Sequence, residues 1–65
     1  MQILLNGKRF ATDAKTLDEL CEDLGFAGAK IATAVNGSFV AAADRKLTPL
    51  AEQAEVEIVA PRQGG

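Results

Sequence analysis

The first twelve residues, MQILLNGKRFAT (residues 1–12), contain the pattern that decides the fold. Residues 1–5 form an apolar run suited to a strand, and residues 8–12 continue as a second candidate strand. Between them stands Asn6-Gly7, the strongest short signal for a β-hairpin, because a type I′ turn needs positive φ at both central residues. The chain is therefore expected to open with an antiparallel hairpin.

The strand period of two divides the side chains of residues 1–5 between two faces. Met1, Ile3 and Leu5 share one face of the expected hairpin. Leu4 points the other way, toward solvent or a partner.

The same signal predicts a second hairpin farther along the chain. Residues 31–35 (IATAV) are typical of a strand, and Asn36-Gly37 supplies the turn. Residues 38–40 (SFV) are the short second strand of this hairpin. Both Asn-Gly pairs are interpreted as turn chemistry and not as phosphate-binding loops.

A helix is predicted between the two hairpins, over residues 17–24. Thr16 can cap it, and Glu19 stands at the capping-box spacing three residues later. Apolar side chains then recur at the helical spacing i, i+3, i+4 and i+7. They are Leu17, Leu20, Cys21 and Leu24. Gly25 is a natural residue to end the helix.

The last third of the chain contains one weak pattern and one clear one. Residues 41–54 lack a clean periodicity, and we expect a loop with a turn of helix that places Leu47 and Leu50 on the core. Residues 56–60 (VEIVA) alternate as a strand. Its inward side chains are Val56, Ile58 and Ala60, and its outward side chains are Glu57 and Val59. Pro61 has no N–H, so ladder pairing should stop there.

These segments follow the order β-β-α-β-β-β. Because the last strand is apolar enough to lie inside a sheet, we expect an α+β fold in which a mixed sheet of four or five strands packs on one main helix. One face of the sheet meets the helix, and the other face stays open.

Composition narrows the function classes. A chain of 65 residues makes one small domain, with little room for both a core and a substrate pocket, which argues against an enzyme. One Cys and no His exclude an internal disulfide and a Cys/His zinc site, and a lone thiol fits a reducing cytosol. A net charge of −2 gives no basic surface for nucleic acid. No apolar run is long enough for a membrane span, and no signal peptide is expected.

Taken together, the chain resembles the ThiS family of bacterial sulfur carrier proteins of thiamine biosynthesis, which have the β-grasp, ubiquitin-like fold. Four stretches carry the resemblance over nearly the whole chain: MQILLNG, TLDEL, AVNGSFV and VEIVAPRQGG. The Asn36 position matches an Asn of the family. Two segments depart from the family pattern, Gln53-Ala54-Glu55 in place of a Gly-Asp turn and AAADR after Val40. Both lie in connections, so they affect the expected conformation there more than the expected function.

The resemblance implies a β-grasp domain over residues 1–60 and a flexible Gly-Gly tail over residues 61–65. It also implies a protein cosubstrate without a bound cofactor or metal, monomeric alone and cytoplasmic. A ThiF-like adenylyltransferase would use ATP to join the Gly65 carboxylate to AMP. Sulfur from a donor such as a cysteine desulfurase would then give a C-terminal thiocarboxylate. A ThiG-like thiazole synthase would receive that sulfur.

The candidate site residues follow from this resemblance. Gly65 would bear the sulfur, and the tail that enters the partner's active site would comprise Gly64, Gln63 and Arg62. The partner interface would comprise Leu4, Val59 and Arg62 on the open sheet face and the tail.

Other interpretations remain for the same residues. The chain could be a molybdopterin-type sulfur carrier, a ubiquitin-like modifier or a noncovalent β-grasp binding module. Cys21 is tempting in a sulfur protein, but its place on the apolar helical stripe favours a core role. The acidic residues of the helix are interpreted as a solvated, capping face and not as paired catalytic carboxylates. They are Asp18, Glu19, Glu22 and Asp23.

Overall fold

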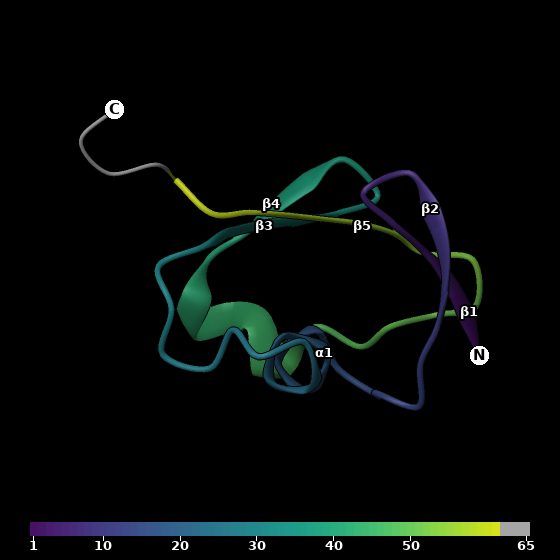
Figure 1. The fold of residues 1–65 in the computed structure, drawn as a ribbon, viewed down its shortest axis with the longest axis horizontal. Coiled ribbons are helices and arrows are strands. Elements are labelled where there is room, and N and C mark those ends of the chain that lie inside the picture. Colours follow the sequence, from purple (N-terminus) through teal and green to yellow (C-terminus); the bar gives the residue numbers. More distant parts are fainter. Residues whose placement is uncertain (62–65) are drawn as a thin grey trace.

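The structure is a computed structural model that describes residues 1–61 (Figure 1). Within that range the chain forms five strands, one α-helix and one 3₁₀ helix. In chain order they are β1 (Gln2–Leu5), β2 (Lys8–Ala11), α1 (Leu17–Asp23), β3 (Ala32–Val35), β4 (Ser38–Val40), the 3₁₀ helix η1 (Ala42–Leu47) and β5 (Glu55–Val59). The predicted order β-β-α-β-β-β is confirmed, and η1 supplies the helical turn expected in the last connection.

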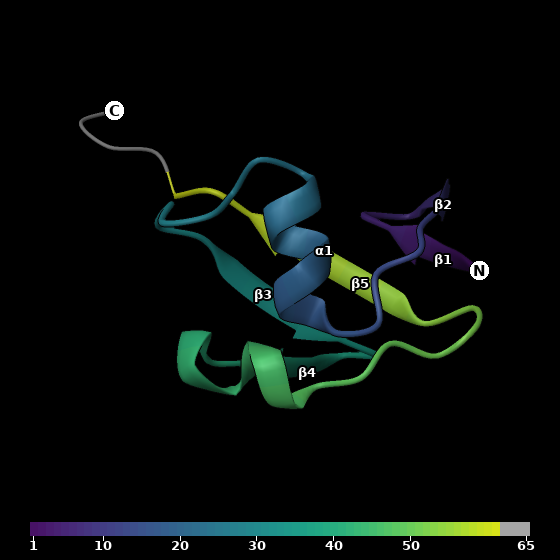
Figure 2. The same cartoon turned by 90° about the horizontal axis from the view of Figure 1, so that it is seen from below.

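The five strands form one mixed sheet in the order β2-β1-β5-β3-β4. Both hairpins are antiparallel, whereas β5 lies between them, parallel to β1 and antiparallel to β3. Helix α1 and η1 pack on one side of the sheet, and no described element covers the other side (Figures 1 and 2). The last strand in sequence is thus the central strand in space, as its apolar pattern indicated.

Both hairpin turns have the expected conformation. Asn6 and Gly7 have φ angles of 51° and 83°, and Asn36 and Gly37 have φ angles of 50° and 84°. Positive φ at both central residues is the type I′ geometry that Asn-Gly favours, because Asn tolerates the left-handed region better than other non-glycine residues.

Helix α1 begins with a variant of the predicted capping box. The Thr16 Oγ1 accepts a hydrogen bond from the Glu19 N–H at 3.2 Å. The Glu19 carboxylate bonds back to the N–H of Lys15 at 2.8 Å, one residue before the N-cap. Leu24 is the C-cap residue, and Gly25 follows with φ +86°. The helix therefore has the expected limits within one residue.

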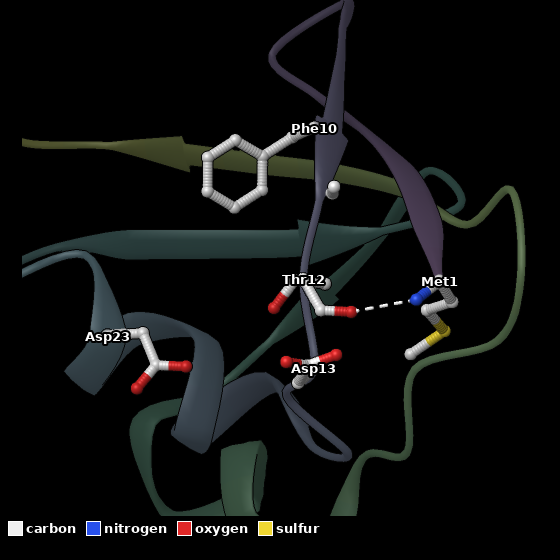
Figure 3. A pocket seen from close by; sticks show the side chains of 6 residues that line it. Met1, Phe10, Thr12, Asp13 and Asp23 are labelled. Atoms are coloured by element: carbon white, nitrogen blue, oxygen red, sulfur yellow. Dashed lines mark hydrogen bonds between the residues drawn. The ribbon is translucent and has the colours of Figure 1, made fainter.

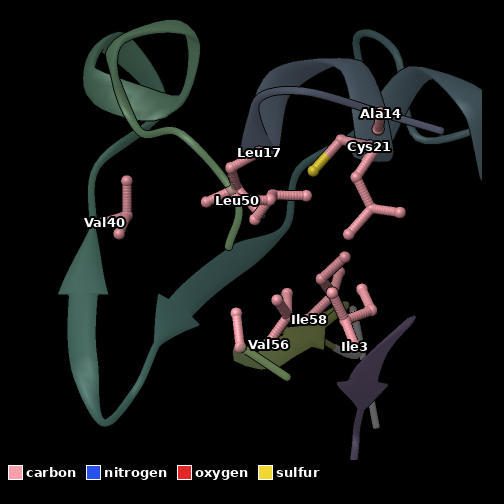
Figure 4. Close-up of a cluster of buried hydrophobic side chains, with 10 residues drawn as sticks. Ile3, Ala14, Leu17, Cys21, Val40, Leu50, Val56 and Ile58 are labelled. Carbon is pink, nitrogen blue, oxygen red and sulfur yellow. The ribbon is translucent and has the colours of Figure 1, made fainter. Parts of the chain in front are cut away.

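The core lies between α1 and the covered face of the sheet (Figure 4). Ile3, Leu17, Leu20 and Val56 are almost completely buried, and Leu50 and Ile58 close the cluster. Burial of each such side chain contributes about 1.5–3 kcal/mol before the loss of chain entropy is subtracted. Leu5 packs partly buried against this cluster, whereas Met1 precedes the strand and stays exposed.

The prediction that Leu47 packs on the core is wrong. Leu50 is buried, but 73% of the Leu47 side chain is exposed. Residues three apart share a side of a 3₁₀ helix, so Ala42 and Arg45 lie on one side of η1 and Leu47 on another. The Arg45 side chain fixes its side of η1 toward the sheet. It donates to the Thr33 Oγ1 of β3 at 3.0 Å and to the carbonyl of Ile31, just before β3, at 2.8 Å.

The predicted inward orientation of Ala60 is also wrong. Strand β5 ends at Val59, whose partner is Ala32, the first residue of β3. Ala60 lies beyond that last pair, outside the strand, and is exposed together with Pro61. Pairing thus stops one residue before the expected limit, because β3 offers no residue farther along.

The connection before β5 contains a strained residue. Gln53 has φ +68°, a left-handed conformation in which a side chain with a Cβ is disfavoured. Its N–H donates to the Gln2 carbonyl at 2.7 Å, and the next residue, Ala54, is buried. The positive φ at position 53 is a conformation that Gly adopts without strain. This explains why a Gly-Asp turn would suit the segment in which this chain has Gln53-Ala54-Glu55.

Replacement of Gln53 by Gly is expected to stabilise the domain. Gly adopts positive φ without steric cost, and the gain exceeds the extra entropy that Gly loses on folding, so the free energy of unfolding should rise by about 0.5–1 kcal/mol. Urea unfolding measures the difference, with Gln53→Ala as the control that removes the side chain but keeps a Cβ. Equal stability of the Gly and Ala variants would contradict the assignment of strain.

Candidate functional site

The candidate site begins where β5 leaves the sheet. The strand crosses the middle of the molecule and exits at the end opposite the N-terminus (Figure 1). Pro61 is the last described residue. The predicted tail residues Arg62, Gln63, Gly64 and Gly65 lie outside the described residues.

An apolar patch lies on the open sheet face beside this exit. Its four residues are Ala32, Ala34, Phe39 and Val59. Phe39 is 73% exposed and Val59 is 58% exposed. The patch is continuous because Val59 pairs with Ala32, and Ala34 pairs with Phe39, on adjacent strands.

The patch is slightly concave and carries one charge. Its residues line a hollow of about 200 Å³ together with Thr33 and Glu57. The Glu57 side chain points outward from the centre of β5, next to Val59 in the alternation of the strand. An apolar surface with an acidic group suits a partner that presents apolar side chains next to a basic one.

The structure separates two residues that the sequence placed in one interface. Leu4 lies on the open face but pairs with Glu55, at the start of β5. Val59 lies four residues farther along that strand, which is about 13 Å at the usual strand rise. Leu4 is half-buried and lines a second hollow of about 210 Å³ with Gly7, Gly37 and Glu57. The apolar patch at the exit is therefore built around Val59 without Leu4.

Sequence reasoning missed Phe39. It is the largest exposed apolar side chain of the patch and lies on the edge strand β4. A signal was present, because strand alternation orients Phe39 opposite to its buried neighbour Val40. A strand of three residues did not reveal which of the two faces the core.

A different hollow, of about 320 Å³, lies next to β2, which is the edge strand at the opposite end of the sheet from β4. Phe10, Asp13 and Asp23 line it, and the Met1 ammonium donates to the Thr12 carbonyl at 2.9 Å (Figure 3). The patch, by contrast, lies over β3, β4 and β5. The two features are thus on separate parts of the molecule.

Cys21 occupies the core, as its place on the helical stripe predicted. The side chain is 4% exposed and belongs to the buried cluster between α1 and the sheet (Figure 4). Burial raises the pKa of the Cys21 thiol, and Asp18 adds to this, whereas the positive charge of Arg45 acts in the opposite direction. A thiol with a raised pKa behind the sheet is a poor nucleophile.

The architecture defines a class of protein. A five-stranded mixed sheet with the last strand in the centre, packed on one helix of the described chain and open on its other face, is the β-grasp, ubiquitin-like fold. None of the helices in residues 1–61 has the length and apolar character to cross a membrane.

Comparisons with known proteins identify the family. The model of the ThiS family matches residues 3–65. A crystal structure of the thiamine biosynthesis protein ThiS from Geobacter metallireducens superposes with a TM-score of 0.81 at 26% identity, over 100% of both chains. Curated proteins give no match. The chain belongs to the ThiS family, the β-grasp sulfur carriers of thiamine biosynthesis.

The core position of Cys21 predicts slow alkylation of its thiol. At pH 8 the native protein should react with iodoacetamide at least about tenfold more slowly than the protein unfolded in urea, because burial limits access and disfavours the thiolate. Mass spectrometry of timed samples measures the rates. Equal rates for the native and unfolded chains would contradict a buried, unreactive thiol.

Proposed function

We propose that this chain carries sulfur as a thiocarboxylate on the carboxyl group of Gly65 and donates it for thiazole formation. The observation that carries the proposal is the extent of the family match, which continues through residue 65 and so includes the Gly-Gly tail. The position of β5 supports it, since the strand that leads to the tail is paired on both sides, with β1 and with β3.

The carboxylate needs outside activation, because it is ionised at neutral pH and is a poor acyl donor. In the proposed reaction, a carboxylate oxygen attacks the α-phosphorus of ATP in a ThiF-like adenylyltransferase, and pyrophosphate leaves. A persulfide sulfur then attacks the carbonyl carbon, and AMP leaves. A second thiol cleaves the sulfur–sulfur bond, which frees the thiocarboxylate. The chain itself supplies no catalytic group and binds no cofactor in this scheme.

The two glycines suit delivery of this carboxyl group into another protein's active site. Gly64 and Gly65 have no side chain to collide with a narrow channel, and Gly adopts backbone angles that other residues avoid. Gln63 and Arg62 precede the glycines and would lie in the entrance of the channel when the tail is inserted. We propose that the Arg62 guanidinium contacts the partner there.

The apolar patch is the proposed docking surface for the adenylyltransferase. Phe39 and Val59 offer a large exposed apolar area on a rigid sheet, two strands apart in space and directly before the tail. Docking at this surface supplies binding energy that a short tail cannot provide alone, and it places the carboxyl group in reach of the enzyme. Leu4 is proposed as a peripheral contact of the same face.

Removal of Gly65, or extension of the chain beyond it, should abolish sulfur transfer. The reacting atom is the terminal carbonyl carbon in this proposal, so a shortened or blocked terminus cannot present it. Thiazole formation is measured with untagged protein and the cognate enzymes, and circular dichroism checks that the fold is unchanged. Normal thiazole formation with a blocked terminus would overturn the proposal.

Val59→Glu should weaken docking without unfolding the domain. A carboxylate at position 59 would lose its hydration against the apolar side chains of the partner, so the KM of the adenylyltransferase for this chain should rise about tenfold or more. Leu47→Glu is the matched control, since Leu47 is also an exposed apolar residue but lies on η1, on the α1 side of the sheet. Equal KM values for the two variants would contradict the assignment of the patch.

A further inference from the structure

Two asparagine side chains bond to the backbone of β5, one at each end of the strand. The Asn36 Oδ1 accepts from the Glu55 N–H at 2.9 Å, at the start of β5. The Asn6 carboxamide bonds to Ile58 near its end: Oδ1 accepts from the Ile58 N–H at 2.9 Å, and Nδ2 donates to the Ile58 carbonyl at 3.1 Å. Both side chains come from the Asn-Gly turns, and neither contact is local in sequence.

The Asn6 side chain continues a ladder that the backbone of β1 leaves unfinished. Leu4 N–H donates to the Ala54 carbonyl at 2.9 Å, and Asn6 N–H donates to the Val56 carbonyl at 2.8 Å. In a parallel ladder the next partners of β5 would be the carbonyl of residue 6 and the N–H of residue 8. The hairpin turns away at Gly7, and the Asn6 oxygen and nitrogen take those two places on Ile58.

Asn is the side chain suited to both tasks at this position. It tolerates the φ of 51° that the turn requires, and its carboxamide offers one acceptor and one donor side by side. Asp lacks the donor, and Gly lacks both groups. Turn formation alone would accept Gly, so the two bonds to Ile58 are a function of Asn6 beyond the turn.

We propose that Asn6 is a positioning residue for sulfur loading, which fixes the exit of β5 and thereby aims the tail at the partner's active site. This inference rests on the proposed function. Ile58 is three residues before Pro61. On the side of β5 that faces β3, pairing extends only as far as Val59. Without the Asn6 carboxamide, the β1 side of the strand has no partner after Val56, and the direction in which the chain leaves the sheet is less well defined.

The test compares Asn6→Gly with Asn36→Gly. Both substitutions keep a residue that accepts positive φ, and both remove a carboxamide bonded to β5. They differ in where the strand loses its partner, at the exit for Asn6 and at the entrance for Asn36. Asn36→Gly is therefore a matched control for general loss of stability.

Two measurements are made on untagged full chains. Hydrogen exchange of single amides reports the bonds, and we expect protection of Ile58 to fall about tenfold in Asn6→Gly and protection of Glu55 to fall in Asn36→Gly. Steady-state adenylation by the cognate enzyme reports positioning. Asn6→Gly should lower kcat about tenfold with an unchanged KM for the carrier, because the docking patch is intact, whereas Asn36→Gly should leave both constants at the wild-type values.

Asn6→Asp gives a second test in case Asn6→Gly is poorly folded. It keeps the acceptor for the Ile58 N–H but places a carboxylate oxygen opposite the Ile58 carbonyl, so kcat should again fall at unchanged KM. A wild-type kcat for both Asn6 variants, or an equal fall for Asn6→Gly and Asn36→Gly, would overturn the positioning role alone. A wild-type chain that the enzyme does not adenylate would contradict the proposed function, and the positioning role with it.

Discussion

The placement of β5 between β1 and β3 is the constraint on which the rest of the structure depends. The strand is the last to be made, yet it joins two hairpins that would otherwise be separate two-stranded ribbons. Such ribbons are marginally stable by themselves, so the sheet and its covered face exist only when β5 is in place. Val56 and Ile58 then complete the core against α1.

The same strand links stability to function. Its side chains alternate, so Val56 and Ile58 anchor it inward while Glu57 and Val59 are presented on the open face. In the proposed function the chain must offer its terminus to other proteins and still hold a fixed shape behind it. Strand β5 is bonded to β1 and Asn6 as far as Ile58 and to β3 as far as Val59, and it is released at Ala60 and Pro61, which meets both requirements. In the proposed function the chemistry belongs to the partners, and the small size of the domain is compatible with that division.

Local chemistry explains why much of the fold was predictable. The Asn-Gly turns, the Thr16 cap and the apolar stripe of α1 each depend on residues close in sequence, and all three are as expected. The central position of β5 also followed from its apolar pattern. The errors arise where a distant segment decides the outcome. Leu47 turns outward because Arg45 bonds to Thr33 of β3, and Ala60 falls outside the strand because β3 starts at Ala32.

The site was predictable to a smaller extent. Val59 was identified from strand alternation, but Phe39 was not, because its strand is too short to indicate its own orientation. The bonds from Asn6 to Ile58 span 52 residues and were invisible, since the Asn-Gly pair is already explained by its turn. A residue whose local role is sufficient to explain it can thus conceal a second role that only the packed structure reveals.

The most direct test of sulfur carriage is the intact mass of the untagged protein after reaction with ATP, a cognate adenylating enzyme and a sulfur source, followed by fragmentation. If Gly65 carries the sulfur, the mass should rise by the difference between one sulfur and one oxygen atom, and the gain should be located at Gly65. An unchanged mass in the presence of a demonstrably active enzyme, or a gain located at Cys21, would contradict this assignment.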